Sequence, residues 1–125
     1  MDIQNRVDIR LMVDRFYALV ETDEFLGPIF YQIIKGNWEP HLEKMVDFWD
    51  SVIFHNPVYQ GKPYPKHADL PITSVHFDRW VNLFNKTVDD LFEGENANRA
   101  KEIGSNVAHV FLAKMYPSKQ QLPIV

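Results

Sequence analysis

Cysteine is absent from this chain of 125 residues. Its absence excludes disulfide bonds, thiolate zinc sites, iron–sulfur clusters and thiol nucleophiles. Any metal binding or acid–base chemistry must therefore use the five histidines and the carboxylates.

Runs of basic residues and long apolar runs are also missing. The 13 Lys and Arg residues are outnumbered by 17 Asp and Glu residues, which gives a formal net charge of −4. No basic cluster could neutralise several phosphates, so we expect no nucleic-acid partner. No stretch approaches the roughly 18 unbroken apolar residues of a membrane span, and the first residues do not resemble a secretory signal. We therefore expect a cytoplasmic protein without membrane association.

The residues that are present suit one compact domain over residues 1–125. Hydrophobic residues make up 46% of the chain and aromatic residues 14%. A chain of this size and apolar content can bury one substantial core. Any function must then be built into that core or onto a single surface cleft.

Apolar residues recur at intervals of three and four, the period of one helix face, in four segments. The first segment predicts a helix over residues 5–21. We expect it to break over residues 22–28, because Gly27 costs backbone entropy and Pro28 disfavours a helical residue before it. A short helical turn over residues 29–33 is expected to follow.

The second predicted helix begins after Asn37, which can act as an N-cap, and it tolerates Pro40 in its first turn. It loses its pattern at residues 54–57. Between residues 56 and 74, four prolines and Gly61 leave no room for a long helix. We expect an ordered, extended segment there.

The third predicted helix is capped by Thr73 or Ser74 and ends at Gly94. The fourth starts near Asn96 and is stopped by Pro117. Four principal helices without credible strands predict an all-α fold.

Three otherwise apolar helix faces each carry one residue with a polar tip: Tyr17, His41 and Trp80. Each alone has an ordinary explanation, since such residues often lie in cores with the tip bonded to backbone or reaching solvent. Together, one on each helix, they favour a common polar point inside the bundle. Motifs for metalloproteases, phosphate loops, nucleophile elbows and EF-hands are absent from the sequence.

His67 lies in the proline-rich stretch 65–71. An extended, proline-stiffened backbone positions an imidazole with little conformational entropy left to lose. On the residues alone, a surface-loop histidine is the slightly favoured interpretation. We expect His76, near the start of a helix, to be exposed, and His55 and His109 show nothing more specific.

The order and spacing of several short segments resemble the third group of truncated haemoglobins. The similarity extends over most of the chain from residue 16 to residue 84. The segments are Phe16-Tyr17 followed by Asp23; Leu26-Gly27-Pro28-Ile29-Phe30; His41-Leu42-Glu43-Lys44-Met45 leading to Phe48-Trp49; Tyr59-Gln60-Gly61-Lys62-Pro63; Lys66-His67-Ala68-Asp69-Leu70-Pro71; and Phe77-Asp78-Arg79-Trp80 leading to Leu83-Phe84.

The resemblance implies a truncated globin-like, two-over-two helical sandwich around haem b. It implies that His67 is the protein ligand to iron, and that Tyr17, His41 and Trp80 lie on the distal side around a gas ligand. Hydroxyl, indole and imidazole N–H groups are hydrogen-bond donors, which suit oxygen better than neutral carbon monoxide. The orientation of His41, inward or outward, is left open by the sequence.

The resemblance also assigns two further groups of residues to the cofactor. Apolar residues would pack against the porphyrin, and cations would face its two propionates. The apolar group is Phe30, Met45, Phe48 and Trp49, and the cations are Lys62, Lys66 and Arg79.

The function that the resemblance implies is binding of diatomic gases, namely oxygen, nitric oxide or carbon monoxide. Nitric oxide dioxygenase or peroxidase-like activity would need a reductase partner, and the sequence decides neither this nor the oligomeric state. Two alternatives stay open. One is a non-enzymatic haem-based gas sensor or a module for another small apolar ligand, and the other is a purely structural helical interaction domain.

Overall fold

The computed structural model describes residues 1–59 and 72–115, apart from the side chains of Ile33 and Met115. This part of the chain forms five helices and no strand: α1 (Arg6–Thr22), α2 (Leu26–Ile34), α3 (Trp38–Phe54), α5 (Ser74–Leu91) and α6 (Glu95–Met115). The predicted all-α fold is confirmed. No helix in these residues is both long and apolar enough to cross a lipid bilayer.

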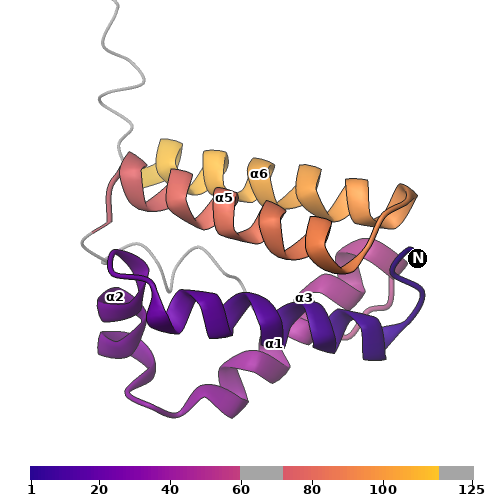
Figure 1. Cartoon of the computed structure of the whole chain (residues 1–125), viewed down its shortest axis with the longest axis horizontal. Coiled ribbons are helices and arrows are strands. Elements are labelled where there is room, and N and C mark those ends of the chain that lie inside the picture. The colour runs from indigo at the N-terminus through magenta and orange to yellow at the C-terminus, as the bar shows by residue number, and fades with distance from the viewer. Residues whose placement is uncertain (60–71, 116–125) are drawn as a thin grey trace, which may run out of the picture.

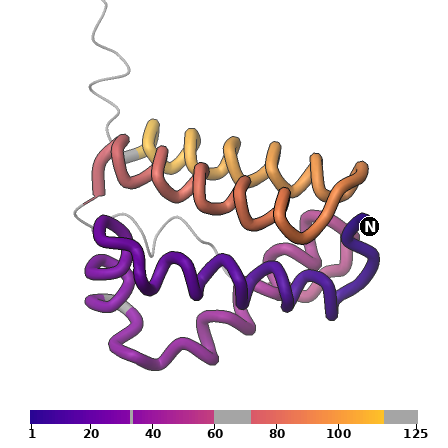
Figure 2. The backbone as a smooth tube through the Cα atoms, viewed as in Figure 1, coloured from indigo at the N-terminus to yellow at the C-terminus, as the bar shows by residue number. Residues whose placement is uncertain are grey.

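Two helix pairs lie one over the other (Figure 1). In one pair α5 and α6 run antiparallel and pack closely on each other, and in the other α1 packs on α3 (Figure 2). The two pairs meet mainly where α1 contacts α5, while α2 packs on α1 at one end of the molecule. This is the two-over-two arrangement that the resemblance to truncated haemoglobins implied.

Helix α1 is central because it packs on α2, α3 and α5 and buries its apolar face against them. Asn5 caps it by accepting a hydrogen bond from the Asp8 amide at 3.0 Å. The predicted stripe is fully buried, together with Met12; its members are Ile9, Val13, Phe16, Tyr17 and Val20. They join α3 and α5 residues in one continuous core.

The break after α1 is shorter than predicted. Helix α2 begins at Leu26, so Gly27 and Pro28 lie inside its first turn instead of in the connection. Pro28 is tolerated there because the first amides of a helix have no intrahelical acceptor. Gly27 permits close packing, since a Cβ atom at this position would lie 2.8 Å from the carbonyl oxygen of Glu21.

The ends of α1 and α3 and the starts of α5 and α6 agree with the predictions to within about one residue, whereas α5 ends at Leu91, three residues before Gly94. The predicted stop of the last helix at Pro117 lies outside the described residues. Thr73 is the N-cap of α5, as expected. Asn37 occupies the N-cap position of α3, but its side chain makes no capping hydrogen bond. Helix α3 ends on His55, which adopts the left-handed conformation with φ of 61°.

The first residues of the chain fasten the α5–α6 turn to the rest of the bundle. The Asp2 carboxylate accepts hydrogen bonds from the Asn96 and Ala97 amides at 2.9 and 2.8 Å, so it caps the start of α6. Ile3 beside it is fully buried. This end of the bundle is therefore closed by side chains and capping bonds.

Candidate ligand pocket

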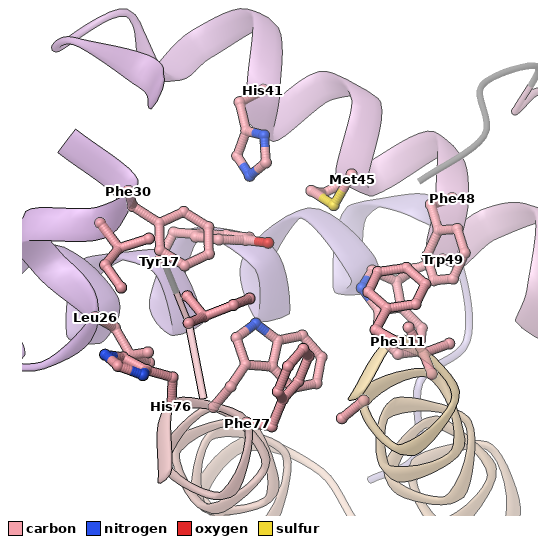
Figure 3. Close-up of a pocket in the computed structure, with 15 residues that line it drawn as sticks. Tyr17, Leu26, Phe30, His41, Met45, Phe48, Trp49, His76, Phe77 and Phe111 are labelled. Atoms are coloured by element: carbon pink, nitrogen blue, oxygen red, sulfur yellow. The ribbon is translucent and has the colours of Figure 1, made fainter. Parts of the chain in front are cut away.

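A pocket lies between the two helix layers and receives side chains from all five described helices (Figure 3). Its empty volume is about 870 Å³, counted with the open solvent at its mouth. The lining residues are Tyr17, Leu26, Ile29, Phe30, His41, Met45, Phe48, Trp49, Ile72, His76, Phe77, Trp80, Val107, Ala108 and Phe111. The walls are thus apolar except for the polar tips of a few tyrosine, histidine and tryptophan side chains.

The three polar-tipped residues singled out from the sequence all line this pocket. Tyr17 comes from α1, His41 from α3 and Trp80 from α5. The rings of Tyr17 and His41 meet edge to face with their centroids 4.9 Å apart. Three helices therefore bring hydrogen-bonding groups to one apolar cavity, as the pattern predicted.

Tyr17 is buried, with only 6% of its surface exposed. Burial raises the pKa of its hydroxyl well above the ordinary value of 10.0, because the phenolate would be desolvated. The group therefore keeps its proton at neutral pH and can act as a donor.

His41 is turned into the pocket, which answers the orientation question that the sequence left open. Its Nε2 atom is buried, and its ring packs beside Phe30 and Tyr17 (Figure 3). The Trp38 ring also contacts it, with the centroids 6.2 Å apart. The first turn of α3, which contains Trp38 and His41, is thereby held against α1 and α2.

The apolar residues predicted to contact a cofactor are all in the lining: Phe30, Met45, Phe48 and Trp49. Trp49 stacks on Phe84 at 4.8 Å between centroids, and Phe48 meets the Tyr59 ring edge-on at 5.4 Å. Met45, Phe48 and Trp49 thus form the apolar side of the pocket that α3 contributes.

Arg79 has a partner within the protein. Its Nε atom donates to Oδ1 of Asp23 at 2.6 Å, and the Asp23 side chain is only 2% exposed. Burial alone would raise the pKa of Asp23, but hydrogen bonds from the Leu26 amide, Arg79 and the Phe25 amide lower it further than burial raises it. This ion pair joins the start of α2 to α5 beside the pocket.

Three predicted residues lie outside the described part of the chain: Lys62, Lys66 and His67. Their assignments stay predictions.

His76 was expected to be exposed, and this was wrong. It is half-buried, lines the pocket and packs edge-on against the Phe25 ring at 6.4 Å. Its Nδ1 atom accepts a hydrogen bond from the Thr73 amide at 3.0 Å. The spacing of N-cap and N3 residue carried this signal, because a side chain at N3 can reach back to the cap.

Further lining residues lie on the apolar faces of α5 and α6. They are Phe77 of α5 and Val107, Ala108 and Phe111 of α6. Helical period identifies which residues face inward, but it does not separate a core contact from a cavity wall.

Comparisons with known proteins agree with this architecture. Residues 3–113 match the family described as bacterial-like globin. The chain is 29% identical over 116 residues to Group 3 truncated hemoglobin ctb of Campylobacter jejuni, covering 90% of this chain and 91% of that protein. The crystal structure of group III truncated hemoglobin from Campylobacter jejuni superposes with a TM-score of 0.86 at 29% identity, covering 93% of this chain and 96% of that one.

Proposed function

Because this chain belongs to the bacterial-like globin family and is similar to group 3 truncated haemoglobins, we propose that its pocket holds haem b. We further propose that the bound haem binds oxygen. The family makes the chain a haem globin. Beyond family membership, we propose which gas it binds, which form of haem it holds, and which residues contact the haem and the gas.

The pocket suits a porphyrin by its chemistry. Apolar side chains from five helices line it, and a porphyrin ring is itself broad and apolar. Phe30, Met45, Phe48 and Trp49 are proposed to pack on the ring, and His67 to ligate its iron. Lys62, Lys66 and Arg79 are proposed to face the propionates, Arg79 with the guanidinium nitrogens that it does not use toward Asp23.

When bound, haem would supply an iron atom that can bind a diatomic gas. The chain would supply hydrogen-bond donors to that gas. Tyr17 keeps its hydroxyl proton, and the indole of Trp80 is a donor only. The meeting of Tyr17, His41 and Trp80 in one apolar cavity is the observation that carries the proposal.

Absorption spectra of the purified full chain test the proposal. Protein supplied with haem is expected to show a Soret band that shifts when the reduced form is exposed to carbon monoxide or oxygen. Protein that stays folded but takes up no haem would contradict the proposal and favour a pocket for another small apolar ligand.

The proposed ligand is tested by His67→Gly. We expect this variant to lose haem or change its axial ligation, and added imidazole to restore the wild-type spectrum by entering the vacated space. His55→Gly is the matched control, because His55 is exposed and its left-handed backbone accepts glycine. A His67→Gly spectrum identical to that of the wild type would refute the assignment.

A further inference from the structure

The indole of Trp80 is held by one ring of its own helix and one ring of α1. The indole stacks on Phe84 of the same helix at 5.3 Å and 8°, and Phe16 of α1 meets it edge-on at 5.2 Å. Phe84 stacks in turn on Trp49 of α3 at 4.8 Å and 11°. Trp80, Phe84 and Trp49 therefore form one parallel stack, and a shift of Phe84 moves the rings on both sides of it.

Helix α6 covers this stack with a residue that has no side chain. Gly104 is buried near the middle of α6. A Cβ atom there would lie 3.0 and 3.1 Å from Cδ2 and Cε2 of Phe84, and 3.5 Å from Cζ3 of Trp80. The first two distances are shorter than ordinary van der Waals contact, so an added methyl group would push Phe84 away from α6.

Glycine in the middle of a helix weakens the helix, and alanine is the best helix former. Secondary structure therefore gives no reason for glycine at this position, whereas the close contact with Phe84 and Trp80 does. This contact involves Trp80, which lines the pocket, and Phe84, which stacks on it.

We propose that Gly104 is a positioning residue for Trp80. The missing side chain sets how far the indole reaches into the pocket, and with it the hydrogen bond that the indole N–H gives to oxygen. This inference rests on the proposed function, because it concerns the gas ligand of the haem-bound protein.

Gly104→Ala is expected to move the stack by a few tenths of an ångström. Hydrogen bonds weaken steeply when their distance and angle depart from the optimum. We expect oxygen to leave about 2 to 10 times faster, which corresponds to losing part or all of one ordinary hydrogen bond. Release of carbon monoxide, a poorer acceptor, is expected to change much less.

The experiment measures oxygen and carbon monoxide dissociation for the haem-bound wild type, Gly104→Ala, Trp80→Phe and the double variant. If Gly104 acts through Trp80, the alanine substitution adds nothing in the Trp80→Phe background. Asn106→Ala is the matched control, because it adds helix propensity at an exposed position of the same helix.

Nuclear magnetic resonance of the indole N–H groups gives a second readout. The Trp80 resonance, assigned with Trp80→Phe, is expected to shift in Gly104→Ala and to stay in place in Asn106→Ala. Should Gly104→Ala fail to fold, Phe84→Leu loosens the same stack without adding atoms and is expected to speed oxygen release as well.

The outcomes separate the two proposals. If the wild type takes up no haem, the proposed function is wrong. A wild type that binds oxygen, with Trp80→Phe accelerating its release while Gly104→Ala leaves both the rate and the resonance unchanged, overturns the role of Gly104 alone. A change in Gly104→Ala that persists in the Trp80→Phe background overturns it too.

Discussion

Among the residues of the pocket, Tyr17 has the best-defined chemical state. Burial raises the pKa of its hydroxyl, so the group stays protonated at neutral pH. His41 of α3, the helix that packs on α1 in the same layer, meets its ring edge to face. A buried donor of this kind is expected to matter for any ligand with an acceptor atom.

Tyr17→Phe removes that donor and keeps the ring that packs on Phe16 and Phe30. Loss of one buried hydrogen bond costs about 1–3 kcal/mol, so we expect oxygen release to be about 5 to 150 times faster. Stopped-flow measurements check this, with Tyr31→Phe, at an exposed position of α2, as the control. An unchanged rate would remove Tyr17 from ligand stabilisation.

At the scale of helices, two arginines of α1 bind carboxylates of α3 in different surroundings. Arg6 donates to Asp50, whose side chain is 6% exposed, at 2.9 Å, and to Asp47 at 2.6 Å. Arg10 contacts Glu39 and Glu43, both largely exposed, at 2.9 and 2.7 Å. We expect the exposure of the acceptor carboxylate to determine how much each arginine contributes to the free energy of unfolding.

Arg6→Met is expected to lower the free energy of unfolding by about 1–3 kcal/mol, because it leaves a buried carboxylate with fewer donors. Arg10→Met is expected to cost no more than about 1 kcal/mol, since exposed ion pairs are screened by water and salt. Urea unfolding of the two variants gives the comparison. Equal costs would show that burial of Asp50 does not determine the strength of the contact.

The helices themselves were largely predictable from the sequence, because the apolar stripes of α1, α3, α5 and α6 follow the helical period. The start of α2 was misplaced because Gly27 and Pro28 are both helix breakers in general but are tolerated in a first turn. From the residue pattern alone, the pocket was indicated only by Tyr17, His41 and Trp80, and the family resemblance added the apolar lining residues of α2 and α3. The hydrogen bond of His76 with the Thr73 amide was predictable from the spacing of N-cap and N3, but its contact with Phe25 was not, because no local pattern contains it.

For the molecule as a whole, two aspartates fasten elements that are distant in sequence. Asp2 caps α6, and Asp23 joins α2 to α5. Burial alone would raise the pKa of each, but hydrogen bonds from backbone amides, and from Arg79 in the case of Asp23, lower both pKa values below the ordinary 3.8. The folded chain therefore takes up these protons at lower pH than the unfolded chain.

A lowered pKa in the folded state contributes stability that is present above the unfolded value of 3.8 and is lost as pH falls through the folded value. We expect the wild type to lose stability steeply below about pH 4. Asp23→Asn should be less stable at pH 7 but lose less on acidification. Denaturant unfolding followed by circular dichroism from pH 7 to 3 checks this.

Asp78→Asn is the control for the acid experiment, because Asp78 is an exposed aspartate on α5. Parallel pH profiles for the wild type and Asp23→Asn would mean that the Asp23 carboxylate is not a source of the acid sensitivity.

All three tryptophans of the chain are gathered around one cavity. Trp49 and Trp80 line it, and Trp38 packs on Tyr17 and His41 at its edge. A porphyrin seated there would accept excitation energy from every indole at short range. The intrinsic fluorescence of the protein should then be almost extinguished on loading, so emission intensity alone would report the fraction of molecules still empty.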